Sequence, residues 1–135
     1  MLDIPHAQKL LTENFAPWVL DLAPTITALG PDGAALEIPI TDRIARVGGL
    51  VCGQAVSALA DTTMVFACAG HLGDFVPVAT TNLETRFLAA ARGTSMLCTA
   101  RVIRAGRALI FAEAHLVSLP DNRLVAAASA TFFKP

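Results

Sequence analysis

The sequence has few charged residues, few cysteines and few histidines, and each shortage argues against a class of protein. Charged residues make up 16% of the 135 residues, and the ten basic ones are scattered, so no nucleic-acid-binding surface is expected. A basic amphipathic helix that would bind a membrane surface is also missing. With 54% hydrophobic residues, the chain is too apolar to be disordered and long enough for one domain around a single core.

The cysteines and histidines are spread too widely for a disulfide framework or a metal site. No two cysteines form a CxxC pair, and the three histidines lie apart from each other. These residues are Cys52, Cys68, Cys98, His6, His71 and His115. Such cysteine usage fits a reducing compartment. The N-terminus has no positive segment followed by an apolar run, so we expect a cytoplasmic protein without a signal peptide. From the spacing of the cysteines and histidines, we expect no bound metal.

The longest apolar segment, residues 48–70, could be a membrane span or a buried helix. Asp61 lies near its middle, where a charge costs roughly 3 kcal/mol on insertion scales, and Gln54 adds to that cost. We therefore interpret the segment as a helix over about 49–69, enclosed in a protein that does not insert into a membrane. A carboxylate in such surroundings is costly unless it is paired or used in chemistry.

The rest of the chain predicts a sheet that encloses this helix. A short helix is expected over about 3–16, with Asp3 as its N-cap and Pro5 in its first turn. Strands are then expected from apolar and polar residues that alternate with period two. Their ranges are 25–29, 34–40, 78–88, 94–104, 107–118 and 123–133. The predicted fold is α+β: a single domain, residues 1–135, in which an antiparallel sheet of about six strands wraps round one long helix.

The central helix carries a polar stripe on one side. Gln54, Ser57 and Asp61 are spaced i, i+3 and i+7, which places them within about 60° of one another around the helix. Two interpretations remain open at this point. The stripe could face water or a neighbouring subunit, or it could line a polar groove that holds a reacting group.

Glycines cluster where the central helix begins. Gly48, Gly49 and Gly53 permit close approach of a ligand to the backbone, and the free amides of a helix start suit an oxygen that gains negative charge. Gly53 and Asp61 are eight residues apart, or about 12 Å along the helix, which is too far for both to act on one substrate atom. This distance predicts a dimer with sites between subunits, in which Asp61 acts on a carbonyl held by another subunit's helix.

Two stretches resemble a known family. GGLVCGQAVSALADTTM, followed by VATTNLETRFLAAARG, is similar to the hotdog-fold acyl-CoA thioesterases of the phenylacetic-acid-degradation (PaaI-like) group. That group shows a pattern close to N-x-x-G-x-V-H-G-G-x-x-x-x-L-A-D-T-A-M. The resemblance covers about residues 34–133 and implies a sheet wrapped round one helix. It also implies a dimer or a dimer of dimers with active sites between subunits.

The resemblance assigns roles to several positions. Asp61 matches the carboxylate that activates water or attacks the thioester, and Gly53 matches the residue whose amide polarises the carbonyl. Thr80 or Thr81 matches the hydroxyl residue that places water. The family pattern has His at Cys52, Gly at Gln54 and Asn at Arg46, so three groups that orient substrate or water differ here. The residues expected to bind substrate are Arg46, Gly49, Cys52, Gln54, Ser57, Asn82, Arg104 and Arg107.

Two further interpretations concern charge and nucleophilicity. Arg104 and Arg107 are either solvent-exposed side chains of a hairpin turn or residues that hold the phosphates of coenzyme A. Cys52, near a helix start, either packs against substrate or acts as a nucleophile. The sequence as a whole predicts hydrolysis of an acyl-CoA thioester, with coenzyme A as part of the substrate and no other cofactor. The alternative is a non-catalytic protein that binds acyl-CoA or another small ligand on the same fold.

Overall fold

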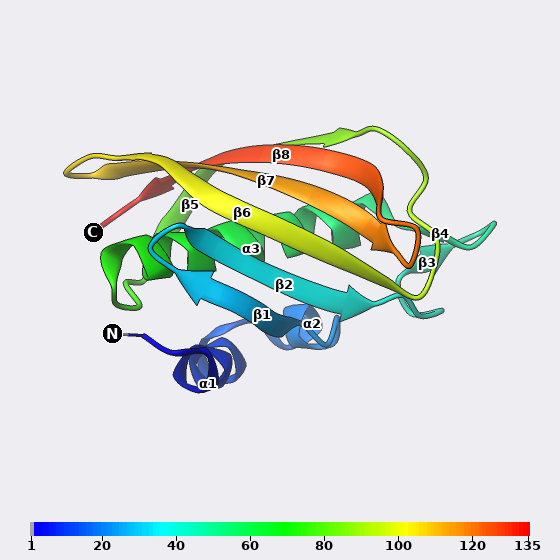
Figure 1. Cartoon of the computed structure of the whole chain (residues 1–135), viewed down its shortest axis with the longest axis horizontal. Coiled ribbons are helices and arrows are strands. Elements are labelled where there is room, and N and C mark those ends of the chain that lie inside the picture. The colour runs from blue at the N-terminus through cyan, green and yellow to red at the C-terminus, as the bar shows by residue number, and fades with distance from the viewer. Residues whose placement is uncertain (1) are drawn as a thin grey trace.

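The computed structural model describes residues 2–135 and shows a six-stranded antiparallel sheet curved round one long helix (Figure 1). The chain starts with helices α1 (Ile4–Asn14) and α2 (Pro17–Leu20), and the long helix is α3 (Gly53–Leu72). The strands are β1 (Thr25–Gly30), β2 (Gly33–Pro39), β3 (Ala45–Arg46), β4 (Leu50–Val51), β5 (Ala79–Phe87), β6 (Ser95–Ala105), β7 (Leu109–Leu119) and β8 (Arg123–Phe133). This is the hotdog arrangement that the sequence predicts.

The main sheet has the order β1-β2-β6-β7-β8-β5, so β1 and β5 are its two edges. The predicted alternation appears in the burial of its strands. In β7, Ile110, Ala112 and Ala114 are buried against α3, whereas Phe111 and His115 are exposed on the outer face. Strands β7 and β8 therefore each contribute one apolar face to the core, which explains why period two was the informative signal.

Helix α3 forms the centre of the core. Twelve of its 20 residues are buried, and it contacts every long strand of the sheet. Among the described residues it is the one helix long and apolar enough to cross a membrane. Most of it is buried inside the protein, as expected for the core helix of a folded domain. Gly70 lets α3 pack directly on β1, because a Cβ atom at this position would overlap the carbonyl oxygen of Gly30.

The start of the central helix differs from the expectation. The helix begins at Gly53 and not near residue 49, because residues 45–46 and 50–51 pair as the two-stranded sheet β3–β4. Gly48 and Gly49 form the turn between these strands with φ of 93° and 78°. Positive φ is incompatible with a right-handed helix, so the glycines delay the helix start.

The two N-terminal helices lie beside the β1 edge of the main sheet (Figure 1). The sheet itself leaves one face of α3 uncovered. Helix α1 is capped by Asp3, whose carboxylate accepts a hydrogen bond of 2.9 Å from the amide of His6. It ends at Asn14, and Pro17 starts the separate helix α2, which was not predicted. The face of α3 between these helices and β5 carries the polar stripe.

Candidate active site

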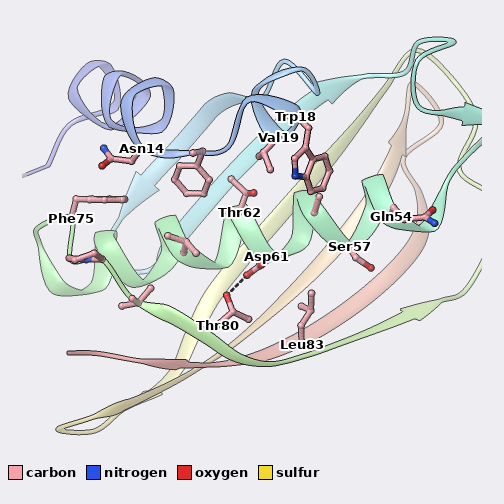
Figure 2. A pocket seen from close by; sticks show the side chains of 15 residues that line it. Asn14, Trp18, Val19, Gln54, Ser57, Asp61, Thr62, Phe75, Thr80 and Leu83 are labelled. Carbon is pink, nitrogen blue, oxygen red and sulfur yellow. Dashed lines mark hydrogen bonds between the residues drawn. The ribbon is translucent and has the colours of Figure 1, made fainter.

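The main pocket lies along the uncovered face of α3, between α1 and α2 on one side and edge strand β5 on the other (Figure 2). Its volume is about 630 Å³, within the range of small-molecule sites. The whole polar stripe lines it. The other lining residues are mostly apolar: Asn14, Phe15, Trp18, Val19, Ala58, Thr62, Val65, Phe75, Pro77, Val78, Thr80 and Leu83. In the single chain, the stripe therefore lines a groove.

Asp61 is the one carboxylate among the residues that line the main pocket. The hydroxyl of Thr80 donates a hydrogen bond of 2.8 Å to its Oδ1. Burial raises the pKa of Asp61 above its ordinary value, and the Thr80 hydrogen bond lowers the pKa but does not cancel that effect. A carboxylate with a raised pKa is a stronger base than an ordinary Asp, and the bond from Thr80 fixes its orientation.

A second side-chain bond also joins the stripe to β5. The hydroxyl of Ser57 donates to that of Thr85 at 3.0 Å, one turn before Asp61 on the helix. Both bonds arise because residues 57 and 61 lie on the same face of α3, the face turned toward β5. They hold the edge strand against the helix and fix the floor of the main pocket.

A separate hollow, here called the Gly53 hollow, lies at the start of α3. It has a volume of about 310 Å³ and is lined by Arg46, Leu50, Val51, Gly53, Val56, Phe87, Ala89, Ala90, Ala91 and Val125. As the first residue of the helix, Gly53 has an amide that no preceding helical carbonyl can accept. The ring of Phe87 lies close to Gly53: a Cβ atom added at Gly53 would come within 3.3 Å of that ring. Asp61 does not line this hollow.

Residues 48–125, more than half of the chain, match the family model described as the thioesterase superfamily, and this match contains Gly53, Asp61 and Thr80. The chain belongs to the thioesterase superfamily. Membership indicates hydrolysis of a thioester as the type of reaction. No curated protein sequence matches the chain.

Solved structures with the same fold include several related to this superfamily. A candidate thioesterase from Silicibacter sp. TM1040 is 28% identical with a TM-score of 0.88, covering 100% of this chain and 93% of that one. Zebrafish thioesterase superfamily member 2 is 21% identical with a TM-score of 0.87, covering 100% of both chains. A thioesterase from Haemophilus influenzae is 20% identical with a TM-score of 0.86, covering 98% and 90%. The last two likenesses show the hotdog fold alone.

The structure places the predicted site residues of this thioesterase-superfamily chain in three groups. Gln54, Ser57, Asp61 and Thr80 meet in the main pocket. Arg46 and Gly53 lie in the Gly53 hollow. The remaining positions line neither of these sites in the single chain: Gly49, Cys52, Thr81, Asn82, Arg104 and Arg107.

Within this last group, the local structure explains the separation. The hydroxyl of Thr81 donates to the carbonyl of Thr131 at 3.1 Å, at an irregularity in the pairing of β5, so it turns away from Asp61. Arg104 and Arg107 are exposed on the β6–β7 hairpin. Cys52 occupies the N-cap position of α3 without a side-chain capping bond. It lines a third hollow with Trp18 and Arg43, and the residues that line this hollow include no histidine.

Sequence reasoning did not find the opposite wall of the main pocket. Asn14, Phe15, Trp18 and Val19 come from α1, α2 and the segment between them, before the matched region begins. None of these four residues was among the expected site residues. The signal that was available is Pro17, which starts the separate helix α2 that carries Trp18 and Val19.

Proposed function

We propose that the protein hydrolyses an acyl-CoA thioester to a free acid and coenzyme A, with Asp61 as the catalytic residue. The observation that carries this proposal is Asp61 itself: a carboxylate of raised pKa, oriented by Thr80, in a largely apolar pocket of a thioesterase-superfamily chain. The resemblance to the PaaI-like group supports coenzyme A as the thiol carrier.

The chemistry needs a group that delivers oxygen to the thioester carbonyl. Asp61 either removes a proton from water, whose oxygen then attacks the carbonyl carbon, or attacks that carbon itself and forms an anhydride that water hydrolyses. In both routes the C–S bond breaks, and the thiolate of coenzyme A leaves and takes up a proton. The amide of Gly53 would stabilise the negative charge that develops on the carbonyl oxygen.

We infer that the working unit is a homodimer, because Gly53 and Asp61 of one chain lie in different hollows. Ser57 stands midway between them in sequence and is bonded to Thr85 on edge strand β5. If a two-fold axis passed close to this bond, the two copies of α3 would lie antiparallel to each other. This arrangement would then bring Gly53 of each copy to Asp61 of the other. The free backbone edge of β5, which needs a cover, supports pairing along this strand.

Arg46 and Phe87, which line the Gly53 hollow, are the candidates to contact the part of the substrate next to the thioester. Arg46 stands where the PaaI-like pattern has Asn, and its guanidinium can donate to a carbonyl or a phosphate. Arg104 and Arg107 are the candidates for the coenzyme A phosphates, reached from the β6–β7 hairpin.

The alternative function is non-catalytic binding of an acyl-CoA or another small ligand. Cys52 and Arg46 at the positions of the family's His and Asn favour it, whereas the retained Asp61–Thr80 pair favours catalysis. Purified protein should be incubated with short-chain, long-chain and aryl-CoA thioesters while free thiol is measured, with Asp61→Asn as the matched control. Thiol release by the wild type alone supports hydrolysis; binding of a thioester without thiol release supports the alternative.

A further inference from the structure

The wall of the main pocket that faces α3 lies outside the matched superfamily region. That wall consists of Asn14, Phe15, Trp18 and Val19, and the family model begins at residue 48. Figure 2 shows Trp18 above Ser57, and Val19 opposite Thr62. The shape of the pocket therefore depends on a segment outside the match.

This wall is anchored to the core. The ring of Phe15 stacks on buried Phe66, with centroids 5.6 Å apart and an interplanar angle of 22°. The side-chain amide of Gln8 joins α1 to the start of β1, because both its nitrogen and its oxygen form hydrogen bonds there. Its Nε2 donates to the carbonyl of Pro24 at 3.0 Å, and its Oε1 accepts from the amide of Ile26 at 2.9 Å. A wall held by packing and hydrogen bonds keeps its shape and can discriminate ligands by size.

Asp61 separates a polar part of the main pocket from an apolar part. Toward the start of α3, Gln54 and Ser57 line it. Toward the end of α3, the lining is mostly apolar, with Phe15, Val65, Phe75, Pro77 and Val78; the polar Asn14 also lies there, and its side-chain amide donates to the carbonyl of Leu10. A charged ligand would lose its hydration in this apolar part without gaining a partner, so the part suits an uncharged hydrocarbon chain.

We propose that α1 and α2 form the acyl chamber of this protein for a straight aliphatic acyl chain, and that Val19 controls the chain length accepted. The inference rests on the proposed function, since the acyl group extends from a thioester beside Asp61 into the apolar part of the pocket. Val19 lies opposite Thr62, the residue that follows Asp61, on the α2 side of the main pocket, so an acyl chain that extends from Asp61 toward Phe15 would run beside it. Each methylene that the chamber covers should raise kcat/KM by about fourfold.

The kinetic test compares straight-chain substrates from acetyl-CoA through butyryl- and octanoyl- to dodecanoyl-CoA in three proteins. Val19→Phe narrows the passage, and we expect the ratio of kcat/KM for octanoyl-CoA to that for acetyl-CoA to fall by about tenfold or more. Val117→Phe is the matched control, because Val117 lies on the outer face of β7, away from the pocket. Its chain-length profile should equal that of the wild type. If Val19→Phe gives that same profile, the inference is wrong.

Binding can be measured without catalysis because Trp18, the single tryptophan of the chain, lies in the proposed wall. Its fluorescence should respond to S-octyl-coenzyme A, a thioether that cannot be hydrolysed, more strongly than to S-ethyl-coenzyme A, and the difference should disappear in Val19→Phe. This result without any thiol release from acyl-CoA would mean that the proposed function is wrong and the chamber correct. Thiol release with an equal Trp18 response to both thioethers would mean the reverse.

A second variant with a smaller side chain keeps the inference testable if Val19→Phe does not fold. Val19→Ala widens the passage, and we expect the ratio of kcat/KM for dodecanoyl-CoA to that for butyryl-CoA to increase. Circular dichroism checks that both variants are folded. An unchanged ratio in folded Val19→Ala would overturn the inference even if Val19→Phe were insoluble.

Discussion

Thr80 donates a hydrogen bond of 2.8 Å to Asp61, and this bond joins the edge strand β5 to the central helix at the middle of the main pocket. It solves two problems with one contact. Burial alone would leave the carboxylate destabilised and free to rotate, and the hydroxyl both stabilises the charge and fixes its direction. Because the bond only partly offsets burial, Asp61 stays a stronger base than an exposed Asp.

The carboxylate should be required for turnover. We expect Asp61→Asn to lower kcat by about 100-fold or more, the size of effect typical of losing general base catalysis, while the folded structure persists. Steady-state kinetics of thiol release measures this, with Asp121→Asn, an exposed change in the β7–β8 turn, as the control. Equal turnover in Asp61→Asn and wild type would contradict the assignment.

The two threonines that match the family motif should differ in their effect on pH dependence. Thr80→Val removes a bond that lowers the pKa of Asp61, so that pKa should increase and the acid limb of the kcat/KM profile should move to higher pH. We expect kcat/KM near neutral pH to fall by about tenfold as orientation is lost. Thr81→Val should not move the acid limb, because Thr81 bonds the carbonyl of Thr131. A shift caused by Thr81→Val alone would exchange the two roles.

The stability of the folded state should also report on Asp61. Its pKa is raised by folding, so the folded protein binds this proton more tightly than the unfolded chain does. As pH increases from the ordinary pKa of Asp through the raised value, the unfolded chain ionises first and the folded state loses stability. Asp61→Asn removes this loss, and its Tm should exceed the wild-type Tm at neutral pH but equal it at about pH 3. Thermal melts at both pH values check the sign, and a lower Tm of the variant at neutral pH would contradict it.

The fold could be predicted because its signals are local. Period two in residues 109–119 and an apolar helix with a carboxylate on one side are visible without tertiary information. The same helix geometry placed Gln54, Ser57 and Asp61 on one face, and the structure shows them lining one pocket. The start of α3 was less accessible, since Gly48 and Gly49 serve equally well in a helix-entry loop and in the tight β3–β4 turn that the chain adopts.

The composition of the site could be predicted only in part, because its second wall depends on tertiary packing. Nothing in the sequence of residues 14–19 states which face of which element they will cover. That placement follows from the Phe15–Phe66 stack and from the bonds that Gln8 makes to the start of β1. Which of the two threonines meets Asp61 likewise depends on tertiary packing: the hydroxyl of Thr80 bonds Asp61, whereas that of Thr81 bonds the carbonyl of Thr131.

The packing of α3 on β1 depends on a single missing methyl group. A Cβ at Gly70 would overlap the carbonyl of Gly30, so the two backbones would have to separate. We expect Gly70→Ala to destabilise the protein by about 3 kcal/mol, the upper part of the range for overpacked cores. Gly30→Ala is a matched control on the other side of the same contact, because a Cβ there meets no atom within 4 Å. Urea denaturation of both variants measures the difference, and similar midpoints would contradict this account of the contact.

Mixing two inactive variants would show whether the active site is shared between subunits. Asp61→Asn removes the carboxylate, and Gly53→Val places a side chain between the helix-start amide and Phe87, so each homodimer should lose about 100-fold or more in kcat. In a mixed dimer, one site would combine an intact Gly53 with an intact Asp61 from the other subunit. Random exchange makes half of the dimers mixed, with one of two sites intact, so activity should recover to about one quarter of the wild-type value. Subunit exchange is verified by native mass spectrometry. If mixed dimers form and stay inactive, Gly53 and Asp61 do not act across the subunit boundary, and the oxyanion donor must be sought within the main pocket of the same chain.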